Sequence, residues 1–481
     1  MIDLQECYDY AAGFSKKEIK EMGIVYTPPN IIDAINQRVL QLWKAKHHAP
    51  PRVVDFSCGT GLFLIDMVEK ISRTWGMPEL GAMTYVRGCD TDHGAVDIAA
   101  KYLPNSDLQV GDGLDYPLDD VDIIVGNPPY IRIQNLSKSA RNKIENLEWT
   151  DSDYDIYLAF YERALRSGAI VGFVSPNSWL HTRAGLAMRE YLFSNRDITE
   201  LIDFRDKRIF KKIDAYCSIL ITSKQARDFY LFKTSLEDAG ETIAYGERSS
   251  NNLPFYEKEV SFLKDVENRS TSLFDVCDIK VGLATLADSV FLLKGCHLNE
   301  EDDVVFVKES MTFTIEKGAT RTCKKASDIA SLLNGRKDRI VYPYHDGKLM
   351  GEMELFRKFP RAYEYLSLFK KRLLERDRGK MKESEWYAFG RTQSLNSTGK
   401  KLLLPSFLNK PYTLEDEGSL YISGYAAFLK EDSGIRFEEL KQVFLSEDLY
   451  KWIELKGKPL SSGWRGINKT MFKGYKILQS A

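Results

Sequence analysis

The chain has 481 residues, of which 43% are hydrophobic, and this length is comfortable for two domains with proper cores. No apolar run approaches the roughly 20 residues of a membrane-spanning helix, and acidic residues open the chain where a secretory signal would be basic. The net charge is only −2, and the seven cysteines and six histidines show no paired or metal-ligand spacing, which favours a cytoplasmic protein without a metal site or a membrane partner.

The first half of the chain alternates strand patterns with helix patterns. This alternation predicts an α/β fold, a doubly wound and mostly parallel sheet with helices on both faces. Thr27 and Pro28 predict a helix start, because threonine is a good N-cap and proline a good first helical residue. Residues 52–64 predict a strand, a turn with Gly59 and Gly61, and a helix. Glycine allows a backbone to approach a ligand closely, although this turn lacks the full dinucleotide fingerprint.

Acidic residues end the next two predicted strands. The strand at residues 85–90 ends at Asp90, where a doubly wound sheet places a carboxylate that binds ribose hydroxyls. The strand at residues 108–113 carries Asp112, which can accept a hydrogen bond from an adenine amino group. Each acid alone is more often a solvated loop residue. Their order along the chain, followed by the motif described next, favours binding of a nucleoside-containing ligand.

The most informative motif is Asn127-Pro128-Pro129-Tyr130, directly after the apolar run 121–125. The Asn127 side-chain oxygen and the Pro128 carbonyl can each accept one N–H bond of a planar amino group. The nitrogen is then pushed toward tetrahedral geometry, with its lone pair directed at an electrophilic methyl group. Prolines hold such acceptors in place, and Tyr130 offers a face for stacking a base. The simpler alternative is a turn that ends a strand.

With these motifs in this order, the chain resembles the gamma-class (TaqI-like) adenine-N6 DNA methyltransferases of type II restriction-modification systems. Residues 23–29 are similar to motif X of that family, 55–63 to motif I, and 127–130 to motif IV. The resemblance implies a class I S-adenosylmethionine-dependent methyltransferase fold and S-adenosyl-L-methionine as the cofactor. The cofactor-binding residues that it implies are Thr27, Asp55, Ser57, Gly59, Gly61, Asp90 and Asp112.

Two later segments extend the resemblance. Residues 155–160 are similar to motif V and residues 208–215 to motif VIII, in which the aromatic at Phe210 stacks on a flipped target base. Flipping costs a few kcal/mol, and an aromatic face recovers about 1–3 kcal/mol per stacked base. The alternative for Phe210 is ordinary core packing. The implied catalytic residues are Asn127, Pro128, Pro129, Tyr130 and Phe210, and the implied reaction needs no metal.

The polar stretch 238–254 predicts a domain boundary. We expect a catalytic domain at residues 1–245 and a C-terminal mixed α+β domain at residues 255–481. Residues 1–250 carry a net charge of about −7 and residues 251–481 about +5, so the second half is expected to meet phosphates. The resemblance implies that this half is a target-recognition domain for double-stranded DNA.

Three segments of the second half are candidates for DNA contact. Residues 356–378 predict a densely charged helix, although such a face is more often simply solvated. Residues 386–396 mix aromatics with Arg, Gln and Asn, which pair with guanine and adenine edges in the major groove. The end of the chain adds basic residues around Trp464, namely Lys456, Lys458, Arg465, Lys469, Lys473 and Lys476.

The expected reaction is methyl transfer to the N6 amino group of a flipped adenine in a specific DNA sequence, in the cytoplasm and at the nucleoid. A protein glutamine methyltransferase and an RNA base N-methyltransferase are alternatives, because their acceptors pose the same geometric problem. A degenerate DNA-binding subunit is the non-enzymatic alternative. We expect a monomer, and we find no convincing nuclease motif, so a companion restriction endonuclease would be a separate protein.

Overall fold

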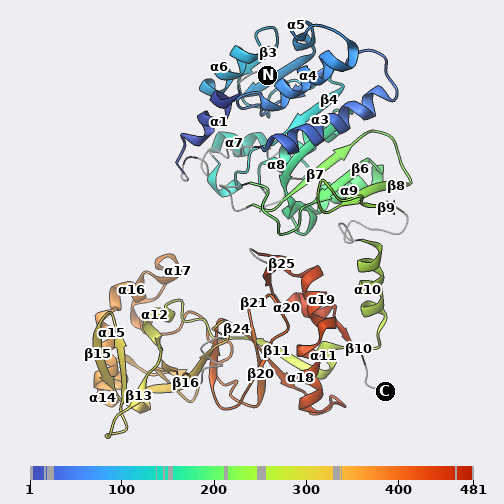
Figure 1. Cartoon of the computed structure of the whole chain (residues 1–481). Coiled ribbons are helices and arrows are strands. Elements are labelled where there is room, and N and C mark those ends of the chain that lie inside the picture. Colours follow the sequence, from blue (N-terminus) through green and yellow to red (C-terminus); the bar gives the residue numbers. More distant parts are fainter. Residues whose placement is uncertain are drawn as a thin grey trace. The chain divides into compact units, whose positions relative to one another are not determined.

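The computed structural model describes residues 4–15, 18, 27–136, 138–144, 147–149, 155–210, 215–245, 256–328, 336, 338–460 and 463–478. The chain divides into two compact units, Met1–Ser261 and Phe262–Ala481, and Figure 1 labels many of their elements. The predicted boundary stretch 238–254 contains one strand of the first unit, and the division itself falls inside a helix. Most of the motif X segment and residues 211–214 of the motif VIII segment lie outside the described residues.

The first unit is built on one nine-stranded sheet. Its strands are β1 (Val53–Asp55), β2 (Val86–Asp90), β3 (Asp107–Val110), β4 (Ile123–Gly126), β5 (Ile170–Pro176), β6 (Ile198–Asp203), β7 (Cys217–Thr222), β8 (Phe229–Lys233) and β9 (Glu241–Ala244). They lie in the order β3-β2-β1-β4-β5-β7-β6-β8-β9. The strands from β3 to β5 run parallel, and β7 is antiparallel to both of its neighbours. This arrangement confirms the predicted doubly wound, mostly parallel sheet of the class I methyltransferase fold.

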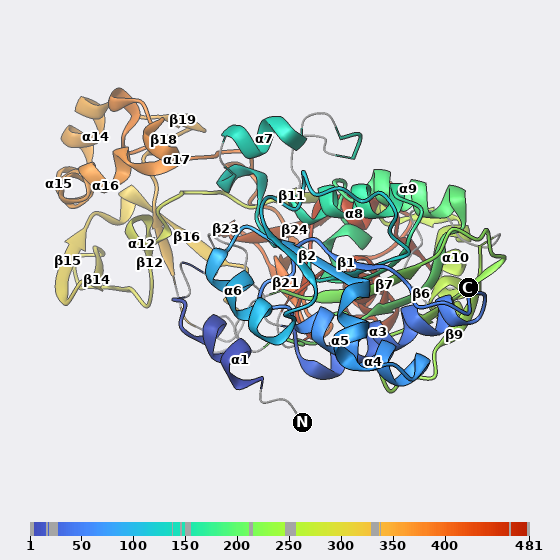
Figure 2. The same ribbon diagram turned by 90° about the horizontal axis from the view of Figure 1, so that it is seen from above.

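Helices cover both faces of this sheet. They are α1 (Gln5–Ala12), α3 (Pro29–Lys44), α4 (Leu62–Trp75), α5 (Glu79–Ala82), α6 (His93–Tyr102), α7 (Lys138–Ile144), α8 (Tyr157–Arg166) and α9 (Leu186–Asn195), with short 3-10 turns η1 (Met83–Tyr85), η2 (Ile133–Asn135) and η3 (Asn177–Leu180). Figure 2 shows α3 and α4 on one side of the sheet and α8 and α9 on the other. Successive strand residues point to opposite faces, so Val53 packs with α3 and α4, and Val54 packs with α8.

The start of α3 differs from the prediction by one residue. The helix begins at Pro29, with Pro28 at the N-cap and without a side-chain cap, so Thr27 is not the capping residue. Pro29 suits the first helical position because its missing N–H would have no partner there. The apolar residues Ile31, Ile35 and Val39 follow at helical spacing and are buried against the sheet. The Thr27 hydroxyl is therefore available for a partner elsewhere in the fold.

The second unit combines helices with several smaller sheets. Its strands are β10 (Thr271–Ser272), β11 (Cys277–Val281), β12 (Leu292–Leu293), β13 (His297–Leu298), β14 (Val304–Lys308), β15 (Met311–Ile315), β16 (Thr320–Lys325), β17 (Arg339–Val341), β18 (Tyr344–His345), β19 (Lys348–Leu349), β20 (Lys401–Pro405), β21 (Phe407–Leu408), β22 (Leu414–Asp416), β23 (Leu420–Ile422), β24 (Gly424–Leu429), β25 (Lys458–Pro459), β26 (Arg465–Gly466) and β27 (Lys476–Ile477). The two four-stranded sheets have the orders β11-β24-β20-β22 and β12-β17-β16-β23. This mixture is the α+β architecture that the sequence predicts.

The helices of the second half are short. They are α10 (Glu257–Asn268), which contains the division between the units, α11 (Leu273–Val276), α12 (Asp288–Phe291), α14 (Glu352–Lys358), α15 (Pro360–Leu368), α16 (Lys370–Leu374), α17 (Arg376–Gly379), α18 (Phe437–Leu445), α19 (Glu447–Lys456) and α20 (Lys469–Lys473), with 3-10 turns η5 (Lys317–Ala319) and η6 (Glu383–Glu385). The segment 356–378 is thus several short helices, not one, because Pro360 cannot continue α14. Within the described ranges, every helix is too short or too polar to cross a membrane.

Candidate functional site

A cavity of about 300 Å³ lies in the first unit, lined by the segments that follow β1, β2, β3 and β4. The strand order reverses between β1 and β4, because β2 and β3 extend the sheet on one side and β5 on the other. Open α/β sheets bind ligands at such a switch point. The cavity brings together many of the predicted site residues, namely Thr27, Asp55, Ser57, Gly59, Asp90, Asp112, Asn127 and Pro129.

Asp55 is a buried carboxylate at the end of β1. It is 2% exposed, and its Oδ1 accepts a hydrogen bond from the backbone N–H of Ser57 at 3.0 Å. The end of β4 leaves room for it, since a Cβ on Gly126 (φ +146°) would lie 2.6 Å from Asp55 Oδ1. Burial raises the pKa of Asp55 to about 7, and the charge of Asp90 adds to this effect. An ionised Asp55 is therefore a strong partner for a positively charged ligand group.

Asp90 fastens the glycine turn to the end of β2. Its Oδ2 accepts from the Gly59 N–H at 2.7 Å and its Oδ1 from the Asp92 N–H at 3.0 Å, and burial raises the pKa of Asp90. No atom lies within 4 Å of the position that a Cβ on Gly59 would take, so a side chain there would project into the cavity. Gly61 does not line the cavity; it packs against Ala99 of α6.

Asp112 follows β3 and already has two partners. Its Oδ1 accepts from the Leu114 N–H at 3.0 Å, and its Oδ2 pairs with the Lys143 ammonium of α7 at 2.7 Å. Lys143 also pairs with Asp115. This ion pair ties α7 to the segment after β3, a link that no local sequence pattern predicted.

Asn127 lies directly after β4 and is half-buried on the cavity wall. Its side-chain amide donates a hydrogen bond from Nδ2 to the Thr27 hydroxyl at 3.0 Å. Thr27 is 5% exposed and stands just before α3, 100 residues away along the chain. The hydrogen bond fixes the rotation of the amide plane, so the nitrogen end faces Thr27. Pro128 is buried, and Pro129 also lines the cavity.

Tyr130 and Phe210 contact each other beside this site. Their ring centroids are 6.4 Å apart, and the ring planes meet at 73°. Phe210 is 4% exposed and packs in the core cluster between α3, α4 and the sheet. The Tyr130 hydroxyl lies 3.9 Å from Cys217 Sγ, and burial raises the pKa of Tyr130 well above its ordinary value. The two rings are edge to face, so in this structure they do not form a parallel slot for a base.

Several aromatic residues that line the cavity, among them Tyr10 and Phe160, are not among the predicted site residues. Tyr10 of α1 donates a hydrogen bond to Asp92 Oδ1 at 2.8 Å. Phe160 of α8 stacks on Phe56 with ring centroids 5.0 Å apart. Phe160 lies in the segment similar to motif V, which could have indicated it. Tyr10 has no motif around it, and only the packing of α1 on α6 brings it to the cavity.

The cavity has the groups that S-adenosyl-L-methionine requires. The buried carboxylate of Asp55 is available to a cationic group, the carboxylates of Asp90 and Asp112 are available to hydroxyl and amino groups, and the turn at Gly59 leaves open space beside the backbone. Among the described residues, no group of three or more His, Cys, Asp or Glu side chains is placed to hold a metal ion. The seven cysteines are all buried and form no disulfide.

Comparisons with known proteins agree with this geometry. Residues 118–210 match the family described as Eco57I restriction-modification methylase. The chain is 24% identical to the type II methyltransferase M.BanIII of Aneurinibacillus aneurinilyticus, over 83% of this chain and 79% of that protein. It is 24% identical to the type II restriction enzyme and methyltransferase RM.Eco57I of Escherichia coli, over 64% of this chain and 34% of that protein.

The fold also has a solved relative. The type IIL restriction-modification enzyme MmeI, solved in complex with DNA, superimposes with a TM-score of 0.58 at 12% identity. The match covers 96% of this chain and 66% of that one, and at this identity it establishes likeness of fold. These matches confirm the predicted resemblance to type II restriction-modification methyltransferases: residues 118–210 match a restriction-modification methylase domain of the Eco57I type, and the first unit has the class I S-adenosylmethionine-dependent methyltransferase fold.

Proposed function

We propose that this DNA methyltransferase of the restriction-modification type transfers a methyl group from S-adenosyl-L-methionine to the N6 amino group of a flipped adenine in a specific double-stranded DNA sequence. The observation that carries the proposal is the Asn127 amide, held by Thr27 at the wall of the cavity and followed by two prolines and an aromatic. An amide oxygen and a proline carbonyl in this place are acceptors for the two N–H bonds of a planar amino group.

The acceptors make the amino nitrogen nucleophilic. In adenine the lone pair of this nitrogen is delocalised into the ring. When Asn127 Oδ1 and the Pro128 carbonyl each accept one N–H bond, the lone pair leaves the ring plane. S-adenosyl-L-methionine supplies an electrophilic methyl group when bound. The nitrogen would form the new C–N bond as the methyl–sulfur bond breaks, the electron pair would stay on sulfur, and the amino proton would go to water. Fixed acceptors lower the barrier because they need not reorganise.

The cavity residues have separate roles in holding the cofactor. We assign Asp55 and Ser57, with Thr27, to the cationic methionine end, since Asp55 is the most buried acid of the cavity. Asp90 would accept from the ribose hydroxyls, and Asp112 from the adenine amino group. The turn at Gly59 leaves space for the ligand beside the backbone, whereas Gly61 allows the close packing of the turn on Ala99.

The flipped base would enter between Tyr130 and Phe210. The edge-to-face contact of these rings must open for a base to stack, and the Phe210 ring must leave its place in the core. Stacking returns about 1–3 kcal/mol per base, which helps to offset this rearrangement. Alternatively, Phe210 is only a core residue. Its loss would then lower the stability of the protein, but it would leave the ratio of the methylation rates on duplex and unpaired DNA unchanged.

The second unit would bind the target site. The net charge of about +5 over residues 251–481 supports a role in binding phosphates. We propose that it is the target-recognition domain, that the protein acts as a monomer in the cytoplasm and at the nucleoid, and that any companion restriction endonuclease is a separate protein. A monomer suffices because one recognition domain can read an asymmetric site.

The decisive experiment is single-molecule sequencing of DNA from a methylation-free host that expresses the chain. We expect N6-methyladenine at one recurring motif, and none in a host expressing Asn127→Ala. A matched control is Asn195→Ala, because Asn195 is an exposed asparagine at the end of α9 that does not line the cavity. Unmodified DNA, from a protein that still binds S-adenosyl-L-methionine, would refute the proposal and favour an RNA base or a protein glutamine as the acceptor.

A further inference from the structure

We infer that the tripeptide Arg391-Thr392-Gln393 of the second unit, called here the reading loop, contacts base edges in the major groove of the target. The inference rests on the proposed function and names the part of the second unit that sets its sequence specificity. It is carried by a contrast within one segment: the backbone around the reading loop is fixed by buried contacts, whereas its three side chains are exposed and unpaired.

A buried arginine fixes the segment before the reading loop. Arg376 is 6% exposed, and its guanidinium donates to the backbone carbonyls of Trp386 and Ala388 at 2.7 and 2.9 Å. It also donates to the carbonyls of Thr285 and Leu373, each at 2.7 Å. Because a guanidinium is planar and rigid, it holds these backbone segments in one geometry.

The aromatic residues of this segment serve the same purpose. Trp386, Tyr387 and Phe389 are 0%, 1% and 4% exposed and belong to the core of the second unit. The Phe389 N–H donates to the Tyr344 hydroxyl at 2.7 Å, and the Tyr387 hydroxyl to the Met350 carbonyl at 2.7 Å. The sequence made the whole segment 386–396 a candidate for DNA contact; in the structure its aromatic residues are part of the core instead.

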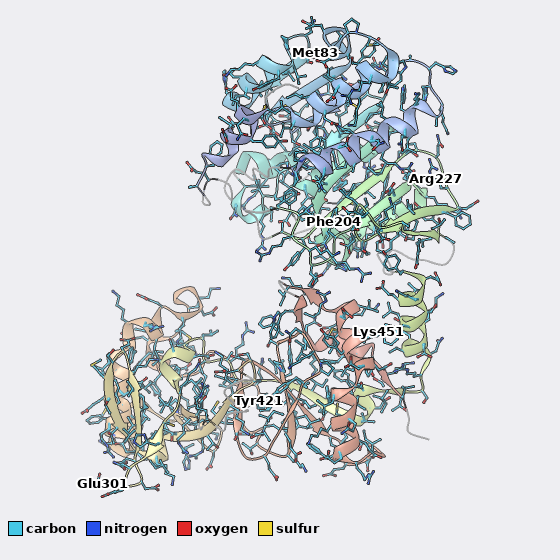
Figure 3. The ribbon with its side chains drawn as sticks, viewed as in Figure 1. Met83, Phe204, Arg227, Glu301, Tyr421 and Lys451 are labelled. Carbon is cyan, nitrogen blue, oxygen red and sulfur yellow. The ribbon has the colours of Figure 1, made fainter. Side chains whose placement is uncertain are left out.

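Both ends of the reading loop are also held. The backbone groups of Arg391 and Ala284 exchange two hydrogen bonds, at 2.9 and 3.2 Å. After the loop, the Ser394 hydroxyl donates to the Val281 carbonyl and accepts from the buried Tyr421 hydroxyl at 3.1 Å. Figure 3 labels Tyr421, which is completely buried in the second unit. The loop is therefore fixed from both sides of the segment.

The side chains of the reading loop, in contrast to its backbone, are not held by hydrogen bonds or ion pairs within the described part of the protein. Arg391, Thr392 and Gln393 are all exposed, and across the described ranges none of their side chains makes a hydrogen bond or an ion pair. Other arginines of the unit have partners within the protein: Arg361 pairs with Asp303, and Arg372 donates to Ser289. An unpaired arginine beside a free amide and a free hydroxyl on a fixed backbone is arranged for an external partner.

The chemistry of these side chains matches base edges. Arginine donates two hydrogen bonds to O6 and N7 of guanine, glutamine pairs with N6 and N7 of adenine, and threonine bonds with either or contacts the thymine methyl group. Such recognition depends on direction, so a fixed backbone lowers the entropy that is lost on binding. Arginine, threonine and glutamine also donate hydrogen bonds to phosphate oxygens, but only base edges offer the paired donor and acceptor groups that a glutamine amide matches. The combination favours base edges over the DNA backbone.

Two other basic residues of the candidate segments, Arg465 and Arg376, are buried. Arg465, in the basic run at the end of the chain, is 7% exposed and donates to the Glu454 carbonyl at 3.0 Å. It is a structural residue, which corrects the expectation that it meets DNA. In the charged segment 356–378, Arg376 is the buried arginine whose guanidinium bonds to the backbone carbonyls of Trp386 and Ala388.

The test compares the methylated motif of the full chain with those of Arg391→Ala, Arg391→Lys and Gln393→Ala in the methylation-free host. If the reading loop contacts base edges, each variant methylates sites that differ from the wild-type motif at one position. Discrimination at that position should fall about tenfold or more. Arg391→Lys should relax the motif as well, since lysine keeps the charge but lacks the planar fork. Arg436→Ala, a change of an exposed arginine at the start of α18, is the matched control with an unchanged motif.

The outcomes separate the two proposals. No methylation by the wild-type chain would refute the proposed function itself. If the wild type is active and all variants methylate the unchanged motif, the reading-loop inference is overturned. It is also overturned if Arg391→Ala methylates the unchanged motif more weakly and Arg391→Lys methylates it at the wild-type level, because that pattern identifies a phosphate contact. Thermal unfolding and S-adenosyl-L-methionine binding of each purified variant exclude misfolding, and Gln393→Ala tests the loop independently of Arg391.

Discussion

Thr27→Val removes the acceptor that holds the Asn127 amide while it keeps the size of the side chain. In the structure the Asn127 Nδ2 donates to the Thr27 hydroxyl at 3.0 Å, and Thr27 is 5% exposed. Loss of the partner of a buried donor costs about 1–3 kcal/mol. If the amide must keep this orientation in the transition state, the same energy raises the barrier. The rate of methyl transfer then falls roughly 5- to 150-fold.

The assay is single-turnover methylation of a duplex that contains the target site, with cofactor and DNA both saturating. The affinity for S-adenosyl-L-methionine is measured separately, because Thr27 also lines the cavity. Thr27→Ser keeps the hydroxyl and should retain most of the rate. The matched control is Thr199→Val, since Thr199 is 5% exposed and its hydroxyl bonds with Ser223 at 3.3 Å, but it does not line the cavity. A wild-type rate for Thr27→Val, with only weaker cofactor binding, would refute the positioning role.

Three further predictions concern the same site. Asn127→Ala should abolish transfer while cofactor binding stays near wild type, because only transition-state interactions are lost; turnover close to wild type would refute the mechanism. Asp55→Asn should stabilise the cofactor-free protein more at pH 8 than at pH 6, as measured by thermal unfolding. Burial raises the pKa of Asp55 from 3.8 to about 7. The wild type therefore loses stability as the pH rises from about 4 to about 7, because the unfolded chain gives up the proton that the folded chain keeps, and the last part of this loss falls between pH 6 and pH 8. Asparagine does not titrate, so a difference in stability that does not change with pH would contradict this. Phe210→Ala should slow transfer to duplex DNA more than Asp90→Ala does at saturating cofactor, although loss of a core phenylalanine also costs about 3–5 kcal/mol of stability, so the assay is run well below the unfolding temperature. Equal responses at the two positions would identify Phe210 as a core residue only.

Local patterns determined the elements that carry the site. The strand, glycine turn and helix of residues 52–64 form as the sequence predicts, as β1 and α4 with the turn between them. The Asn127 motif follows a buried strand as expected. These features depend on neighbours along the chain: apolar strand residues, a glycine in a left-handed turn and prolines that end a strand. The type of sheet followed from the alternation of elements, and the family resemblance added the roles of the residues.

Tertiary structure alone decided which of these residues touch. The Asn127 amide bonds to Thr27, which is 100 residues away along the chain. Lys143 pairs with Asp112 at a separation of 31 residues, and Arg376 bonds to the Thr285 carbonyl at a separation of 91. Hydrogen bonds and ion pairs of this kind form between groups that the fold brings together, so no local pattern encodes them. The same holds for exposure: residues 386–396 mix aromatic and polar residues in the sequence, and only the packing of the second unit separates its buried aromatics from the exposed reading loop.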